Sequence, residues 1–165
     1  WASDFTHNGN VPSAIAANMM GTGLAEEIVY RGLIFTCFVS AWASKKNGLI
    51  LGGVVYAIIF GLSHLVWVFL GKDLAQGILQ SLGAFSSGIL YAGVLVQTRS
   101  IWPAVLIHGL TNTLVYLSIT SIPEYHESTH HGITDLIQGI PLVVFGCAVL
   151  WKFSKQVKKD HPAEM

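Results

Sequence analysis

Five long apolar runs divide the chain, and short polar joints separate them. They cover residues 11–42, 48–70, 74–97, 101–120 and 136–153. Each is long enough to cross a bilayer as a helix, which takes about 20 residues. Alternation with a period of two is absent, and an isolated strand cannot satisfy its backbone in lipid. The pattern predicts an all-α, polytopic transmembrane bundle with about five spans.

Composition supports a membrane protein. Hydrophobic residues make up 52% of the chain and charged residues only 11%, whereas about a quarter of the residues in soluble proteins are charged. Such a chain has too few charges for the polar shell of a soluble domain. The formal net charge is zero, so nothing indicates nucleic acid, and the expected surroundings are membrane lipids.

Basic residues predict how the spans are oriented. Lys45 and Lys46 fill the first joint, Arg99 lies in the third, and four lysines lie at 152–159, whereas the acidic, histidine-rich joint 121–135 has no Lys or Arg. By the positive-inside rule, the first joint, the third joint and the C-terminus are cytoplasmic. The chain opens on Trp, so we expect a single membrane-embedded domain over residues 1–165 that lacks its N-terminal part.

Three charged residues interrupt the first apolar run. Glu26, Glu27 and Arg31 lie inside it, and each ionised side chain at the centre of a bilayer costs roughly 2.5–3.5 kcal/mol. Glu27 and Arg31 are four residues apart and share a helical face, so they can pair. Glu26 points elsewhere and is left free. A purely structural charge network remains the alternative.

Two further spans carry a histidine with a partner four residues away. Phe60 precedes His64, and His108 precedes Asn112. Glu26 and His64 lie at similar depth, roughly 28 Å along their helices from the joint that connects them. His108 lies only about 14 Å past Arg99, so it reaches the same level only if that joint is deeper, the helix tilts or Arg99 snorkels.

Taken together these motifs resemble those of a known family. Residues 26–31 fit the pattern EExxxR, residues 60–64 fit FxxxH and residues 108–112 fit HxxxN, in order and on separate predicted spans, with a motif core over 23–120. The chain thereby resembles the CPBP intramembrane proteases, which include the CAAX prenyl endopeptidases and the bacterial Abi proteins similar to lysostaphin resistance protein A.

The resemblance implies an endopeptidase of a bacterial or archaeal plasma membrane that acts on a peptide or a prenylated protein. Glu26 is expected to be the general base that activates a water, with His64, His108 and Asn112 completing the site. Glu27 would be a second site carboxylate held by Arg31, and Phe60 would support the site.

For the cofactor, the resemblance leaves two expectations, a bound zinc ion or no metal. Family members are named metalloproteases, and Glu26, His64 and His108 could hold zinc with a fourth position open. The HExxH signature is absent from the sequence, and a metal-free glutamate mechanism would use the same side chains.

Three other functions remain possible at this level. A non-catalytic scaffold of the same fold, for example in bacteriocin immunity, would keep the motifs without the activity. A proton-coupled transporter also uses buried Glu, Arg and His, although no internal repeat is visible. A rhomboid-like serine protease would use Ser63 with His108, but it leaves the paired glutamates unexplained.

Overall fold

The structure, a computed structural model, describes residues 11–42, 45, 47–121 and 129–160. The described part of the chain is helical and holds no strand, so the all-α prediction is confirmed. The expectations for residues 1–10, for Lys46 and for the acidic residues at 124 and 127 fall outside the described ranges.

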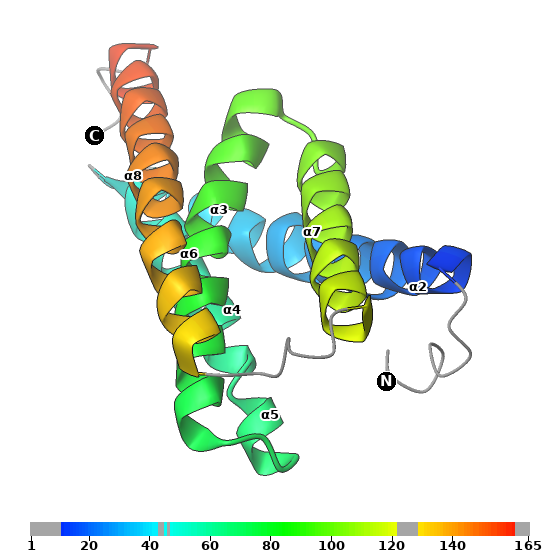
Figure 1. Ribbon diagram of the computed structural model, residues 1–165. Coiled ribbons are helices and arrows are strands. Elements are labelled where there is room, and N and C mark those ends of the chain that lie inside the picture. Colours follow the sequence, from blue (N-terminus) through cyan, green and yellow to red (C-terminus); the bar gives the residue numbers. More distant parts are fainter. Residues whose placement is uncertain (1–10, 43–44, 46, 122–128, 161–165) are drawn as a thin grey trace.

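The first apolar run forms one unbroken helical rod (Figure 1). It consists of α2 (Val11–Ala17), η1 (Asn18–Glu26), η2 (Ile28–Phe35) and α3 (Thr36–Ala41). The segments η1 and η2 are π-helical, with wider turns than an α-helix, and the hydroxyl of Thr36 donates to the carbonyl of Arg31, five residues back, at 3.0 Å. Such π segments occur mostly as single turns and frequently at functional sites. Here Glu26 ends η1, Arg31 lies in η2, and Glu27 lies between the two segments.

The remaining helices follow the other four apolar runs. They are α4 (Gly48–Ser63), α5 (Val66–Phe69), α6 (Leu74–Thr98), α7 (Trp102–Ser121) and α8 (Thr129–Asp160). The second run is interrupted between α4 and α5, and α8 extends past both predicted ends because helical hydrogen bonding continues into polar sequence. The Asp73 carboxylate caps α6 by accepting from the backbone of Gln76 at 3.1 Å.

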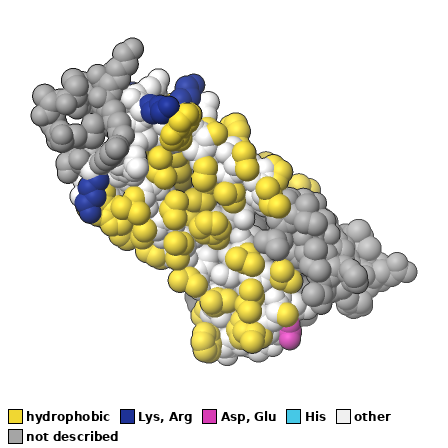
Figure 2. All heavy atoms as spheres, turned by 90° about the vertical axis from the view of Figure 1, so that its left-hand side faces the viewer, with side chains coloured by type: hydrophobic (Ala, Val, Ile, Leu, Met, Phe, Trp, Pro, Cys, Tyr) yellow, Lys and Arg dark blue, Asp and Glu magenta, His cyan; other side chains and the backbone are white. Residues whose placement is uncertain are grey.

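Two helical stretches are long and apolar enough to cross a membrane, judged by length and composition over the described residues. They are Gly48–Phe69 and Leu74–Thr98. The count of about five spans therefore stays a prediction. Large apolar side chains cover much of the outer surface, and Figure 2 shows one such face with basic side chains towards one end and an acidic one at the other.

Helix α6 lies at the centre of the molecule, packed against α4 and α8 (Figure 1). The first rod runs across the direction of α6 and α7, and its η1 segment packs on α7. The buried core contains aromatic and small side chains from the rod, α4, α6 and α8: Phe35, Tyr56, Ala57, Phe60, Ala84, Ile89, Ala92 and Leu150.

Glycines permit the closest helix crossings. A Cβ on Gly23 would lie 3.0 Å from the Val105 carbonyl oxygen and 3.1 Å from the Gly109 Cα, so η1 and α7 touch backbone to backbone. Between α6 and α8, a Cβ on Gly93 would lie 3.2 Å from the Gly146 Cα. Small residues at helix interfaces let backbones approach closely in this way. The first crossing brings the glutamates of the rod to the histidine of α7.

Candidate active site

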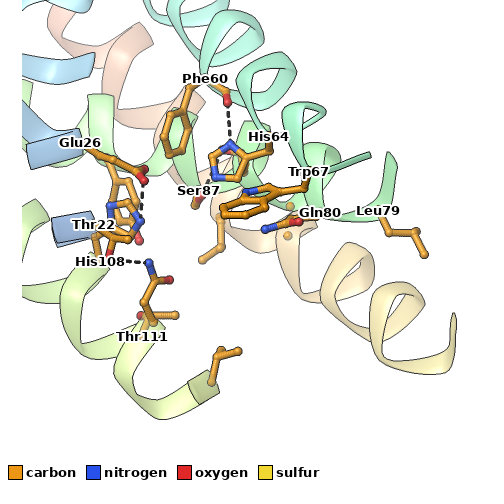
Figure 3. Close-up of a pocket in the computed structure, with 17 residues that line it drawn as sticks. Thr22, Glu26, Phe60, His64, Trp67, Leu79, Gln80, Ser87, His108 and Thr111 are labelled. Atoms are coloured by element: carbon orange, nitrogen blue, oxygen red, sulfur yellow. Dashed lines mark hydrogen bonds and ion pairs between the residues drawn. The ribbon is translucent and has the colours of Figure 1, made fainter. Parts of the chain in front are cut away.

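A pocket of about 410 Å³ opens between the rod and helices α4 to α8 (Figure 3). Polar side chains from the rod, α6 and α7 and apolar side chains share its wall. Its lining residues are Thr22, Glu26, Phe60, His64, Trp67, Leu79, Gln80, Gly83, Ala84, Ser87, Tyr91, His108, Thr111, Asn112, Val115, Gly139 and Leu142.

Glu27 and Arg31 lie behind the pocket as a fully buried ion pair. Arg31 Nη1 is 3.0 Å from Glu27 Oε1, and both side chains are 0% exposed. The pairing predicted from their spacing is therefore present. The same oxygen, Glu27 Oε1, accepts a hydrogen bond from His108 Nδ1 at 2.8 Å. Glu27 thus links the guanidinium to the histidine of α7.

Aromatic rings enclose the Arg31 guanidinium. Its carbon lies 4.1 Å from the ring centre of Phe60, 4.8 Å from that of Tyr91 and 5.2 Å from that of Tyr56. Apart from the 3.0 Å ion pair of Nη1 with Glu27, its nitrogens meet no hydrogen-bond partner within the described structure. Cation–π attraction over desolvated rings is worth about 2 kcal/mol or more, and it offsets part of the free-energy cost of burying these N–H groups without hydrogen bonds. The cage fixes Arg31, and through it Glu27.

His108 presents its other nitrogen to Glu26. Nδ1 donates to the Glu27 carboxylate, which leaves Nε2 on the side of Glu26. Nε2 lies 3.9 Å from Glu26 Oε2, which is too long for a direct hydrogen bond. The Glu26 side chain is 31% exposed, in contrast to Glu27. Both groups therefore keep capacity for a molecule in the pocket.

His64 lies at the point where α4 ends. Its Nδ1 is 2.9 Å from the Phe60 carbonyl oxygen, and since a carbonyl can only accept, Nδ1 donates and Nε2 is left for the pocket. Its ring also meets the Phe60 ring edge to face, with centres 4.9 Å apart. Phe60 therefore orients His64 through two contacts, one with its backbone carbonyl and one with its ring.

Asn112 is held by a residue that the sequence reasoning missed. Asn112 Nδ2 donates to Thr22 Oγ1 at 3.0 Å, and Thr22 in turn donates to the Asn18 carbonyl at 2.8 Å. The second N–H of the Asn112 amide remains available. Thr22 precedes Glu26 by four residues, so its spacing could have indicated that it shares the pocket face.

Tyr91 is a second residue that the motifs did not indicate. Its ring stacks on His108, with centres 5.4 Å apart and planes 28° from parallel. It lies in the middle of α6, in an apolar stretch with no charged neighbour, and no sequence signal distinguished it from a core tyrosine. Only the packing of α6 against α7 and the rod shows that it borders the pocket.

The structure places most of the predicted site residues around one pocket, but it does not arrange them as ligands of a metal ion. Glu26, Phe60, His64, His108 and Asn112 all line the pocket. Yet among the described residues no group of three His, Cys, Asp or Glu side chains is arranged to hold a metal ion. The zinc expectation stays a prediction.

Ser63 lies outside this arrangement. Its hydroxyl donates to the Phe60 carbonyl at 2.7 Å, and it is not among the pocket residues. The contact to a histidine that a serine nucleophile needs is not made here.

The fold and the site define a helical, largely apolar protein with a buried Glu–Arg–His network that opens on a pocket. The family model described as type II CAAX prenyl endopeptidase Rce1-like matches residues 8–114, which contain all three motifs. The chain belongs to this family, which is membrane-embedded.

A relative from Bacillus subtilis (strain 168), described as "Putative membrane peptidase YdiL", is 25% identical over 131 residues. The match covers 79% of this chain and 47% of the relative, so the chain spans about half the length of that protein. No solved structure matches the chain.

Proposed function

We propose that this chain carries the catalytic centre of an intramembrane endopeptidase in which Glu26 activates the attacking water. The observation that carries the proposal is the pair formed by Glu26 and His108 at the pocket wall, 3.9 Å apart at Oε2 and Nε2. Membership of the prenyl endopeptidase family and the name of the Bacillus relative support a peptidase.

The proposed reaction begins with a water bound in the pocket beside the Glu26 carboxylate. The carboxylate takes one proton while the water oxygen bonds to the scissile carbonyl carbon. Glu27, fixed by Arg31, keeps the Nε2 lone pair of His108 directed at the pocket, so His108 can accept a hydrogen bond from the same water. A positioned base of this kind contributes typically 10²–10⁴-fold to the rate.

Asn112 and His64 are placed for the second half of the reaction. The free N–H of Asn112 can donate to the oxyanion that develops on the carbonyl, an interaction worth roughly 10²–10³-fold when the donor is preorganised. As the C–N bond breaks, the proton held by Glu26 passes to the leaving amine, directly or through His64 Nε2. The products are a carboxyl group and a free amine, which balances the hydrolysis.

The pocket walls favour an extended peptide with apolar side chains as the substrate. Trp67, Leu79, Val115 and Leu142 face the same space as the polar groups. A peptide from a membrane-spanning segment and a prenylated peptide both present such apolar groups, and the family description favours the prenylated class.

The decisive experiment measures cleavage of both peptide classes by the purified chain in lipid nanodiscs. We expect Glu26→Gln to lower kcat by roughly 10²–10⁴-fold while the protein stays folded, because the Glu26 side chain faces the pocket and not the buried ion pair. Ser63→Ala is the matched control and should cleave at the rate of the unchanged chain.

Other outcomes point to the alternatives. A folded chain that cleaves neither peptide favours the non-catalytic scaffold, and activity lost in Ser63→Ala would favour a serine mechanism. Zinc content and activity are measured before and after chelation. We expect activity to survive chelation, and loss that added zinc restores would contradict the metal-free form of the proposal.

A further inference from the structure

Helix α6 contains four glycines, and three of them are explained by packing. A Cβ on Gly88 would lie 3.2 Å from the Ala57 Cβ, and one on Gly93 would lie 3.2 Å from the Gly146 Cα. A Cβ on Gly77 would overlap the side chain of Val68. At each of these positions a neighbouring helix or segment occupies the place of a side chain.

Gly83 differs from the other three. Among the residues that the structure describes, a Cβ there would meet nothing within 4 Å. Its backbone is also ordinary, since Gly71 is the one glycine with positive φ among the described residues. Glycine is a poorer helix former than almost any other residue. Within the described part of the chain, neither packing nor conformation therefore accounts for a glycine at position 83.

The empty space beside Gly83 belongs to the pocket. Gln80, Gly83, Ala84 and Ser87 all line it and recur at intervals of three and four residues, so they form one face of α6. Tyr91 continues that face one turn further on. Gly139, the other glycine of the pocket wall, is explained by packing, because its Cβ would lie 2.8 Å from Ser86 Oγ. Of these two pocket glycines, Gly83 is the one without a packing partner among the described residues.

The position of Gly83 gives its distance from the proposed reaction centre. Tyr91 stacks on His108, and Gly83 precedes Tyr91 by eight residues, which corresponds to roughly 12 Å along the helix. An extended peptide advances by about 3.3–3.6 Å per residue. The space therefore lies about three or four peptide residues from the site of attack.

We propose that Gly83 opens a subsite for a bulky apolar side chain of the peptide substrate, about three or four residues from the bond that is cleaved. The chemistry of the group follows from Leu79, one turn earlier on α6, and from the apolar side chains of α7 and α8 across the pocket. The subsite rests on the proposed peptidase function for its place relative to the cleaved bond.

The test compares Gly83→Leu with Gly21→Leu. Gly21 is a matched control because its Cβ would also meet nothing within 4 Å and it does not line the pocket. Peptides carry Ala, Val, Leu or Phe at one position at a time, up to four residues on either side of the cleaved bond. Both kcat/KM and the equilibrium binding of labelled peptides are measured in nanodiscs.

We expect the unchanged chain to prefer Leu or Phe at one position three or four residues from the bond. Gly83→Leu should lower kcat/KM and binding affinity for those peptides by roughly tenfold or more, which is the discrimination that one methylene group gives in an apolar pocket. For the Ala peptide both values should stay within twofold of those of the unchanged chain. Gly83→Ala should give a smaller shift, and Gly21→Leu should keep the original preference.

The two readouts separate this subsite from the peptidase function. An unchanged size preference in Gly83→Leu, or an equal loss for every peptide, overturns the subsite and leaves the peptidase intact. Size-selective binding that Gly83→Leu abolishes, without cleavage by any variant, supports the subsite and contradicts the peptidase. Binding without size preference together with no cleavage contradicts both.

Discussion

At the scale of a single residue, the buried carboxylate of Glu27 links two other side chains of the site. One carboxylate oxygen meets both Arg31 Nη1 at 3.0 Å and His108 Nδ1 at 2.8 Å. Glu26 is adjacent in sequence, yet it faces the pocket and remains partly exposed. Neighbouring glutamates therefore have separate proposed tasks, one holding the histidine and the other acting on water.

Because the two glutamates differ in burial, their conservative substitutions should differ in their effect on stability. Glu27→Gln leaves the buried Arg31 without its counter-charge, and breaking a buried pair costs about 3–5 kcal/mol of stability. Glu26→Gln should change stability little. Thermal unfolding of both variants in detergent measures the difference.

The double variant Glu27→Gln with Arg31→Met provides the check. If the cost comes from the uncompensated charge, the double variant should be more stable than Glu27→Gln alone. Equal destabilisation of Glu26→Gln and Glu27→Gln would show that burial does not distinguish the two carboxylates.

At the scale of helices, the crossing of η1 over α7 assembles the site. Gly23 and Gly109 allow backbone contact there, and side chains next to them bond across the crossing, Glu27 to His108 and Thr22 to Asn112. The first rod runs across the direction of α6 and α7 (Figure 1). Glu26 and His108 therefore meet at a helix crossing and not along parallel helices.

A methyl group at this crossing should separate the helices. Gly23→Ala places a Cβ about 3.0 Å from the Val105 carbonyl, so α7 must move by a few tenths of an ångström. Small misplacements of catalytic groups are costly, and we expect kcat to fall roughly tenfold. Gly21→Ala, two residues earlier in the same segment, meets nothing within 4 Å and should retain full activity in the same cleavage assay. Equal activity of the two variants would show that the crossing tolerates separation.

At the scale of the whole molecule, two Lys–Trp pairs lie near segments that the positive-inside rule assigns to the cytoplasm, one at the first joint and one in the C-terminal part of α8. Lys45 Nζ lies 5.2 Å from the Trp42 ring centre, and Lys155 Nζ lies 3.6 Å from that of Trp151. Tryptophan and lysine are enriched at membrane interfaces. Figure 1 places the end of α8 and the α6–α7 joint at one end of the molecule and the α5–α6 joint at the other.

Cysteine labelling tests this orientation. In a variant with Cys37 and Cys147 replaced by Ser, Lys155→Cys should react with an impermeant maleimide only after cells are permeabilised. Lys72→Cys, in the α5–α6 joint, should react in intact cells. Labelling of Lys155→Cys from outside would reverse the predicted orientation.

The sequence by itself determined the helices and the contacts within one helix. The apolar runs located the helical segments because burial in lipid or in the core requires apolar length, and four-residue spacing gave the Glu27–Arg31 pair because helix geometry sets that distance. The Phe60–His64 contact follows from the same rule.

Only the tertiary structure decided the contacts between helices. His108 bonds to Glu27, 81 residues away, Asn112 bonds to Thr22, and Tyr91 covers both His108 and Arg31. None of these follows from local spacing, because they depend on how closely two backbones approach and at what angle they cross. Small residues set that approach, and their effect appears only when the partner helix is in place.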